Sequence, residues 1–213
     1  RIPNHGFETI DKEIKFLNIE ESILEVSGIR KIATISQTVN NLIIHFRKYQ
    51  EIYPNLHKTT DEVKFTKHLI EKIDQVINRF GEIKDEASPL LQNIRRSINS
   101  VQSQINSSFV SALSAYKSAG YLDEIKETVV DNIRVLAVTA MHRRKVKGSI
   151  LGSSKTGSIV YIQPEATLQF ARELNNLQYE EKEEVKRILK ELTEFIRPSR
   201  ELLIQYQDLL SEI

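Results

Sequence analysis

Hydrophobic residues recur every three or four positions over most of the chain, and two stretches of this kind are long. In residues 88–117 the apolar positions are Leu91, Ile94, Ile98, Val101, Ile105, Phe109, Ala112 and Tyr116. In residues 164–197 they are Leu168, Ala171, Leu174, Leu177, Val185, Ile188, Leu192 and Phe195. This spacing places the apolar side chains on one face of a helix. We therefore predict two helices of about 30 residues, each roughly 45 Å long.

Local signals indicate where these helices begin and end. Ser88 is a favourable N-cap and Pro89 suits the first helical turn, so the first long helix is expected to begin there. Ala119-Gly120 is expected to end it, and Pro198 is expected to break the second. Shorter helices are predicted over residues 7–18, 29–53, 65–80 and 199–213. Ser27-Gly28 is expected to separate the first two of them.

Between the two long helices the helical spacing is replaced by short runs of branched apolar residues. These runs are Val129-Val130, residues 134–138, residues 149–151 and residues 158–162. Residues 152–157 read Gly-Ser-Ser-Lys-Thr-Gly, which is typical of a turn between antiparallel strands. The pattern predicts one small antiparallel sheet confined to about residues 127–163.

The predicted fold is mainly α: a helical core with two long antiparallel lever helices and a small antiparallel β clamp inserted at their tip. The expected divisions are a helical core over residues 1–84, a first lever helix over 85–120, the β clamp over 121–163, and a second lever helix returning into the core over 164–213.

Composition excludes several classes of chemistry. The chain of 213 residues has no cysteine, which excludes disulfides, zinc–thiolate sites and thiol catalysis and is compatible with the reducing cytoplasm where we expect the protein. No apolar run is long enough to span a membrane, and no signal peptide is visible, so no membrane partner is expected. The chain starts at Arg1 and ends on an apolar helical pattern, so we expect a piece of a longer polypeptide.

Two candidate sites for small ligands fail on spacing. Lys155-Thr156 would end a phosphate-binding P-loop, but Ser149 and Ser154 stand where that motif requires glycine, and a strand rather than a helix follows. No histidine has a second histidine or a carboxylate at metal-ligand spacing on a helix. We therefore expect no catalytic residue, cofactor or metal ligand in this region.

Positive charge is densest next to the predicted sheet, although the net charge is only +1. The cluster consists of His142, Arg143, Arg144, Lys145, Lys147 and Lys155. One interpretation is a solvated loop and edge strand, because lysine protects sheet edges from aggregation. The other is contact with the phosphates of a nucleic acid, irrespective of its sequence. Charge alone does not decide between these two interpretations.

Several motifs resemble the bacterial MutS paralogues that carry a C-terminal Smr domain. They are residues 85–91 with Ile94-Arg95, residues 134–138, residues 144–148, Ser153-Ser154 with Gly157-Ser158, residues 161–164 and residues 173–177, in the order found in that family. The resemblance covers residues 85–197. The chain has Gln163 where the family usually has glutamate before the proline that ends the last clamp strand.

The resemblance implies a lever-and-clamp region of a homodimer that encircles nucleic acid. It also implies an ATPase domain, using ATP and magnesium, and a Smr nuclease domain downstream, so this region itself would not be an enzyme. The interpretation favoured here is a clamp that binds branched or mismatched DNA and couples it to the ATPase domain. The alternative is a structural module that contacts the ribosome, including ribosomal RNA, or a partner protein in ribosome rescue.

Overall fold

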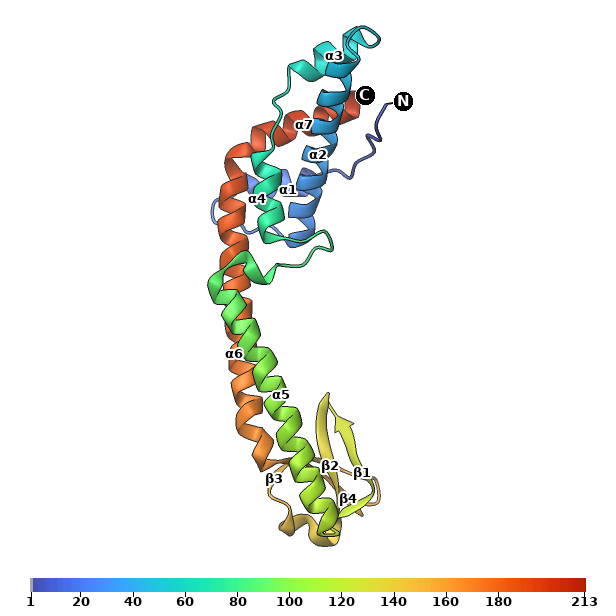
Figure 1. Ribbon diagram of the computed structural model, residues 1–213, viewed down its shortest axis with the longest axis vertical. Helices are drawn as coiled ribbons and strands as arrows, with labels where there is room; N and C mark the ends of the chain where they lie inside the picture. Colours follow the sequence, from blue (N-terminus) through green and yellow to red (C-terminus); the bar gives the residue numbers. More distant parts are fainter. Residues whose placement is uncertain (1) are drawn as a thin grey trace. The chain divides into compact units, whose positions relative to one another are not determined.

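The computed structural model describes residues 2–213 and is mainly α with a small β insert, as predicted. In these residues seven α-helices accompany one four-stranded antiparallel sheet (Figure 1). The described residues form two compact units, one made of residues 2–92 and 182–213 and the other of residues 93–181. The finer division into core, levers and clamp stays a prediction.

The helices are α1 (Asp11–Leu17), α2 (Val26–Lys48), α3 (Pro54–Asp61), α4 (His68–Val76), α5 (Pro89–Ser118), α6 (Glu165–Ile196) and α7 (Arg200–Glu212). The strands are β1 (Leu122–Val130), β2 (Ile133–Thr139), β3 (Gly148–Ser153) and β4 (Ile159–Pro164). Three short 3-10 helices complete the set: η1 (Asp85–Ala87), η2 (Ala140–Lys145) and η3 (Arg197–Ser199).

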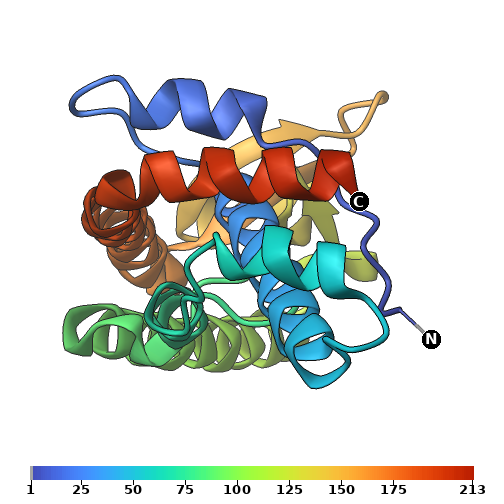
Figure 2. The ribbon, with the colours of Figure 1, turned by 90° about the horizontal axis from the view of Figure 1, so that it is seen from above.

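The core of the first unit is built around α2, which α3, α4 and α7 contact (Figure 2). Its inward face contributes Ile29, Ile32, Ile35, Val39, Leu42 and Phe46, all at most 1% exposed. The buried side of α7 adds Leu203 and Tyr206, which are fully buried. This apolar stripe at helical spacing accounts for the position of α2 at the centre.

Two expected boundaries in this unit are wrong. Ser27-Gly28 does not separate two helices, because α2 begins at Val26 and runs through both residues. A Cβ on Gly28 would lie 2.7 Å from Oε1 of Glu13, so this glycine permits close contact with α1 instead. The helix expected over residues 29–53 ends at Lys48, and Pro54 opens α3, where its missing N–H is not needed.

The expected helix over residues 65–80 is shorter, since α4 ends at Val76. The chain then reverses through Gly81, whose φ of 81° suits glycine, and an antiparallel bridge joins Ile77 to Ile83. Both isoleucines are buried in the core of the first unit, which favours this turn over a further helical turn.

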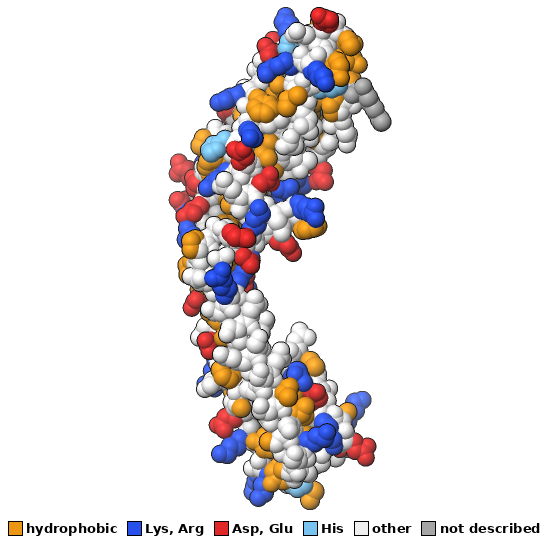
Figure 3. Space-filling model, in the orientation of Figure 1, with side chains coloured by type: hydrophobic (Ala, Val, Ile, Leu, Met, Phe, Trp, Pro, Cys, Tyr) orange, Lys and Arg blue, Asp and Glu red, His pale blue; other side chains and the backbone are white. Residues whose placement is uncertain are grey.

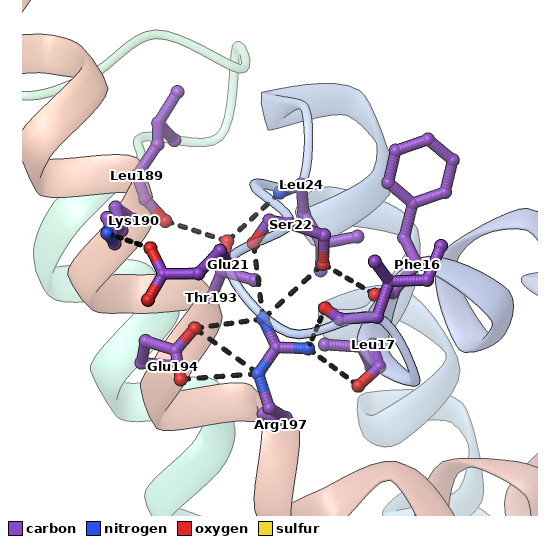
Figure 4. A network of polar contacts seen from close by, with 11 residues as sticks. Phe16, Leu17, Glu21, Ser22, Leu24, Leu189, Lys190, Thr193, Glu194 and Arg197 are labelled. Atoms are coloured by element: carbon purple, nitrogen blue, oxygen red, sulfur yellow. Dashed lines mark hydrogen bonds and ion pairs between the residues drawn. The ribbon is translucent and has the colours of Figure 1, made fainter.

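The break at Pro198 is confirmed, and it lies beside a network of polar contacts made by Arg197 (Figure 4). One guanidinium nitrogen, Nη1, donates to the carbonyl oxygens of Leu17 and Ile19, each at 2.7 Å. The other, Nη2, donates to the carbonyl oxygen of Ser22 at 3.2 Å and to Glu194 at 2.8 Å. Arg197 thus fastens the loop after α1 to the junction of α6 and α7.

The expected start and end of the first long helix are confirmed. Helix α5 begins at Pro89, and the amide of Leu91 donates to Oγ of Ser88 at 3.0 Å, which is an N-cap bond. It ends at Ser118, followed by Gly120 with a φ of 76°. Within the second unit, Nε of Arg95 on α5 donates to Oε1 of Glu181 on α6 at 2.7 Å.

The sheet of the second unit has the strand order β1-β2-β4-β3, with every neighbouring pair antiparallel. It starts at Leu122, earlier than residue 127, because an irregularity between Leu122 and Glu127 extends β1. Lys126 has a φ of 60° within that irregularity.

One face of this sheet packs on α5. Phe109 of α5, 2% exposed, lies in one apolar cluster with Leu136 and Val138 of β2 and Val160 and Ile162 of β4. In each strand the two residues of the cluster are two positions apart. They therefore lie on the same face of the sheet, because successive side chains of a strand point to opposite faces. The sheet is therefore held against the C-terminal half of α5.

Candidate nucleic-acid interface

The basic residues 142–145 lie in η2, a short turn that is bonded to the sheet before it begins. The amide of Thr139 donates to the carbonyl oxygen of Tyr121 at 3.1 Å, and the amide of Ala140 donates to that of Ser158 at 2.9 Å. After the turn, Val146 is 5% exposed and belongs to the apolar cluster under the sheet. The turn is fixed at both ends.

His142 is held inside this turn. Its imidazole is stacked on the ring of Tyr121, with 4.9 Å between ring centroids and 29° between planes. Its Nδ1 lies 2.8 Å from Oγ1 of Thr139. Of the six residues proposed as phosphate contacts, His142 is thus the one whose ring is occupied by intramolecular contacts.

The other five cations point to solvent. Arg143, Arg144, Lys145, Lys147 and Lys155 are all exposed, and within residues 2–213 none of them has a carboxylate within 4.0 Å. Arg187 and Arg197 differ, since both are engaged with glutamates. Exposed cations also occur elsewhere, for example Lys58 and Arg172, and Figure 3 shows lysine and arginine side chains over much of the face drawn, but here three of them are consecutive on one short turn.

Strand order brings Lys155 to the same end of the sheet as the start of η2. Thr139, the last residue of β2, pairs with Ile159, the first residue of β4. The turn between β3 and β4 contains Lys155 and precedes Ile159 directly. Lys147 lies at the opposite end of β3, where Gly148 pairs with Pro164. The proposed residues are consequently spread along η2 from one end of the sheet to the other, with Lys155 near the start of η2 and Lys147 just after its end.

The helix under the sheet carries no negative charge. Helix α5 has no aspartate or glutamate in its 30 residues, and residues 97–116 contain no charged residue at all. Many of its exposed positions are serine, asparagine or glutamine, including Asn99, Gln102 and Asn106, although Leu90 and Val110 are exposed as well. Acidic residues of the sheet lie on and after β1, an edge strand away from β3, and Glu127 there is paired with Arg134 at 2.7 Å.

Gly148 is required by the close approach of two strands at the end of the basic turn. A Cβ at this position would lie 2.0 Å from the carbonyl oxygen of Gln163. No other residue type avoids this overlap. Gln163 itself is 9% exposed, so its side chain is not presented to a ligand.

Sequence reasoning missed two residues of this surface. Tyr121 stacks on His142, and Met141, at the start of the basic run, is 83% exposed. The position of Met141 directly before four basic residues was a visible signal, whereas the pairing of Tyr121 with His142 depends on the fold.

Other parts of the described structure give weaker candidates for a binding site. A cavity of about 410 Å³ is lined by Arg30 and Lys31, but these cations are paired with Asp74 and Glu8, each at 2.9 Å. Within residues 2–213, no group of three or more histidines and carboxylates is arranged to hold a metal ion. No helix in that range is long and apolar enough to cross a membrane.

A mainly helical chain with a basic β insert is the class of structure that these observations define. Comparison with known proteins relates it to proteins named endonuclease MutS2. The chain is 32% identical over 204 residues to the one from Streptococcus equi subsp. equi (strain 4047), covering 91% of this chain and 24% of the relative. It is 27% identical over 202 residues to that of Aquifex aeolicus (strain VF5), covering 94% and 26%.

A third relative, from Caldanaerobacter subterraneus subsp. tengcongensis, is 28% identical over 212 residues, which is 98% of this chain and 26% of the relative. No protein-family model matches the chain. The chain spans about a quarter of the length of these curated relatives and is related to them over most of its own length.

Proposed function

We propose that this chain is a non-catalytic lever-and-clamp region of a MutS-type protein, and that its basic turn binds the backbone of a nucleic acid. The observation that carries the proposal is the set of five exposed cations without carboxylate partners in residues 2–213, on and beside one fixed turn. Cations that only stabilise the fold are usually paired or dispersed. Free cations on a rigid turn suit a ligand that supplies many negative charges.

The contacts would be independent of base sequence. Arg143, Arg144 and Lys145 are consecutive and lie on a 3-10 turn, whereas direct readout of base pairs usually places a helix or a two-stranded ribbon in the major groove. Lysine and arginine side chains on such a turn are suited to phosphate oxygens. The absence of acidic residues from α5 leaves its uncharged polar face beside the sheet compatible with a polyanion.

The relatives supply the wider context of the proposal. Their printed name is endonuclease MutS2, and this chain matches about a quarter of their length. We place the ATPase and the Smr nuclease in other parts of a longer protein that uses ATP and magnesium and acts as a homodimer. In that protein the two long helices would act as levers between the clamp and the ATPase, and the targets would be branched or mismatched DNA.

The test is the salt dependence of binding by the homodimer. Arg143, Arg144 and Lys147 are changed together to alanine, and dissociation constants for a DNA duplex are measured across a salt series. Each lost phosphate contact lowers the slope of log K against log salt by about 0.9, so the triple variant should lower it by about 2.7 for each protomer whose turn contacts the DNA. Affinity should fall for all sequences alike.

The matched control changes Lys58, Lys64 and Lys186, three exposed lysines of the first unit, to alanine. It removes the same net charge and should leave most of the slope intact. Circular dichroism checks that both variants fold. If the folded Arg143/Arg144/Lys147 variant keeps the affinity and slope of the unaltered protein, the cluster is a solvated sheet edge and the proposal is wrong. Competition between branched DNA and ribosomes for the same protein separates the DNA target from a ribosomal one.

A further inference from the structure

Met141 is the most exposed of the large hydrophobic residues, at 83%, and it is the only methionine in the chain. It lies in η2 directly before His142 and the consecutive cations Arg143, Arg144 and Lys145. An exposed apolar side chain at the start of a charged run has no role in the core. It gains free energy only when a ligand covers it.

The turn presents Met141 in a fixed position. The amide of the preceding residue, Ala140, is bonded to the carbonyl oxygen of Ser158 at 2.9 Å. The following residue, His142, is stacked on Tyr121 and bonded to Thr139. Both neighbours of Met141 in the chain are therefore anchored to the sheet, and ordering the backbone on binding costs little.

The surrounding charges limit what covers Met141. A ligand that lies on this surface also meets Arg143, Arg144 and Lys145, so it is a polyanion. A nucleic acid combines a row of phosphates with apolar base surfaces directly behind them. Proteins that bind the minor groove use this combination, with cations on the phosphates and an apolar wedge, methionine included, between base steps.

We propose that Met141 is an apolar wedge that contacts bases of the bound nucleic acid while the neighbouring cations hold its phosphates. This inference rests on the proposed function and extends it to the kind of nucleic acid preferred. Unstacking two bases costs least where pairing is already disturbed. The wedge should therefore favour a duplex with an unpaired base over a fully matched duplex, without reading the sequence.

The first measurement uses Met141 as its own probe. The 213-residue chain is labelled at the methionine methyl carbon, and the Met141→Leu variant identifies its resonance. Two 24-base-pair DNA duplexes are added in turn, one fully matched and one with a single unpaired base at the centre. We expect the methyl resonance to shift with both, more strongly with the second, and to show proton contacts to base or sugar protons.

The second measurement is affinity across a salt series with the same two duplexes. Met141→Ala should bind the duplex with the unpaired base roughly five- to thirty-fold more weakly, the change expected when a side chain of this size is no longer buried. The salt slope should not change, because no phosphate contact is lost. Met141→Leu should bind nearly as the unaltered chain does.

Val129→Ala is the matched control. Val129 is 60% exposed in the same unit, and it pairs with Arg134 at the start of β2, whereas η2 follows the end of that strand. Its replacement should leave both affinity and the preference for the unpaired base unchanged. Both substituted residues are exposed, so neither change removes a core contact, and circular dichroism confirms the fold.

The outcomes separate this inference from the proposed function. If Met141→Ala binds normally while the Arg143/Arg144/Lys147 variant still lowers the slope, the cluster binds phosphates and the wedge is wrong. If neither duplex binds to the homodimer, or no variant of the homodimer alters binding, both proposals are wrong. A methyl resonance that moves only with phosphatidylglycerol vesicles, and not with DNA, would also overturn the wedge.

Discussion

The hydroxyl of Ser88 joins the two longest helices. It accepts a hydrogen bond from the amide of Leu91 at 3.0 Å, which caps α5, and it donates one to Oε1 of Glu184 on α6 at 2.6 Å. Ser88 and Glu184 are 6% and 4% exposed, so both groups are almost withdrawn from water. Because the same hydroxyl caps α5 and bonds to α6, it fixes the position of the first turn of α5 against α6.

Replacing Ser88 by alanine should lower the free energy of unfolding by about 1–3 kcal/mol. The change removes the helix cap and leaves a buried carboxylate oxygen with one partner fewer. Urea denaturation followed by circular dichroism measures the loss. Ser100→Ala is the control, since Ser100 is an exposed residue of α5, and it should change stability by only a few tenths of a kcal/mol. Equal effects for the two serines would contradict the bridging role of Ser88.

Glu184 should make the stability of the first unit depend on pH. Hydrogen bonds from Arg187 at 2.7 and 2.8 Å, and a further one from Ser88, lower the pKa of Glu184 from its ordinary value of 4.5 although burial opposes this. A carboxyl whose pKa is lower in the folded protein contributes stability above its ordinary pKa and loses it as pH falls through the folded value.

Glu184→Gln should therefore cost about 1–2 kcal/mol at pH 7. The difference from the unaltered chain should shrink as the pH falls below about 4.5. Urea denaturation of both proteins between pH 3 and pH 7 tests this. A difference that stays constant over the whole range would mean that the charge of Glu184 is not what stabilises the fold.

Gly148→Ala should unfold the sheet of the second unit locally. Its Cβ would lie 2.0 Å from the carbonyl oxygen of Gln163, so β3 and β4 would have to separate at that end, at a cost of roughly 3 kcal/mol or more. Amide hydrogen exchange should show lost protection in β3 and β4. Gly152→Ala is the control, because its nearest neighbour would be an atom of Tyr161 at 3.7 Å, an ordinary contact. Retained protection in the Gly148 variant would contradict the steric argument.

Local signals in the sequence predicted the parts of the fold that local physics determines. The start of α5 follows from Ser88 and Pro89, its end from Gly120, and the break before α7 from Pro198. Each effect acts through the hydrogen bonds or dihedral angles of a few neighbouring residues. The sheet between the long helices was visible for a similar reason, because branched residues and a glycine-rich turn replace the helical spacing.

Tertiary contacts account for what was missed. Gly28 looked like a break, yet it lies within α2, where the missing Cβ leaves room for Glu13 of α1. Likewise, nothing near His142 in the sequence indicates that Tyr121 covers its ring. The placement of Lys155 beside η2 depends on the strand order β1-β2-β4-β3, which a list of strands does not determine. Whether the basic residues bind phosphates stays a prediction.

The glycine- and serine-rich turn between β3 and β4 should not bind ATP. The amide of Gly157 donates to the carbonyl oxygen of Ser154, and the amide of Ser154 to that of Ile159, both at 2.9 Å. A phosphate-binding loop needs such amides free and directed at the ligand. Calorimetry with ATP and magnesium should detect no heat of binding by the 213-residue chain, and micromolar affinity would show that the turn rearranges into a binding site.

Arg197→Lys should destabilise the first unit although the charge is kept. The planar guanidinium of Arg197 reaches the carbonyl oxygens of Leu17 and Ile19 with one nitrogen and that of Ser22 with another. A single ammonium group cannot satisfy these separated acceptors together. We expect a loss of roughly 1–3 kcal/mol in the free energy of unfolding, since carbonyl oxygens would lose partners.

The loss should be located in the loop after α1, because that loop is what Arg197 holds against the junction of α6 and α7. Hydrogen exchange should therefore rise in residues 18–25, where Leu24 also donates its amide to Oγ1 of Thr193 at 3.0 Å. Arg172→Lys is the control, as Arg172 is exposed on α6 and should tolerate the change. If both variants unfold at the same urea concentration, the charge of Arg197 matters and the geometry of its guanidinium does not.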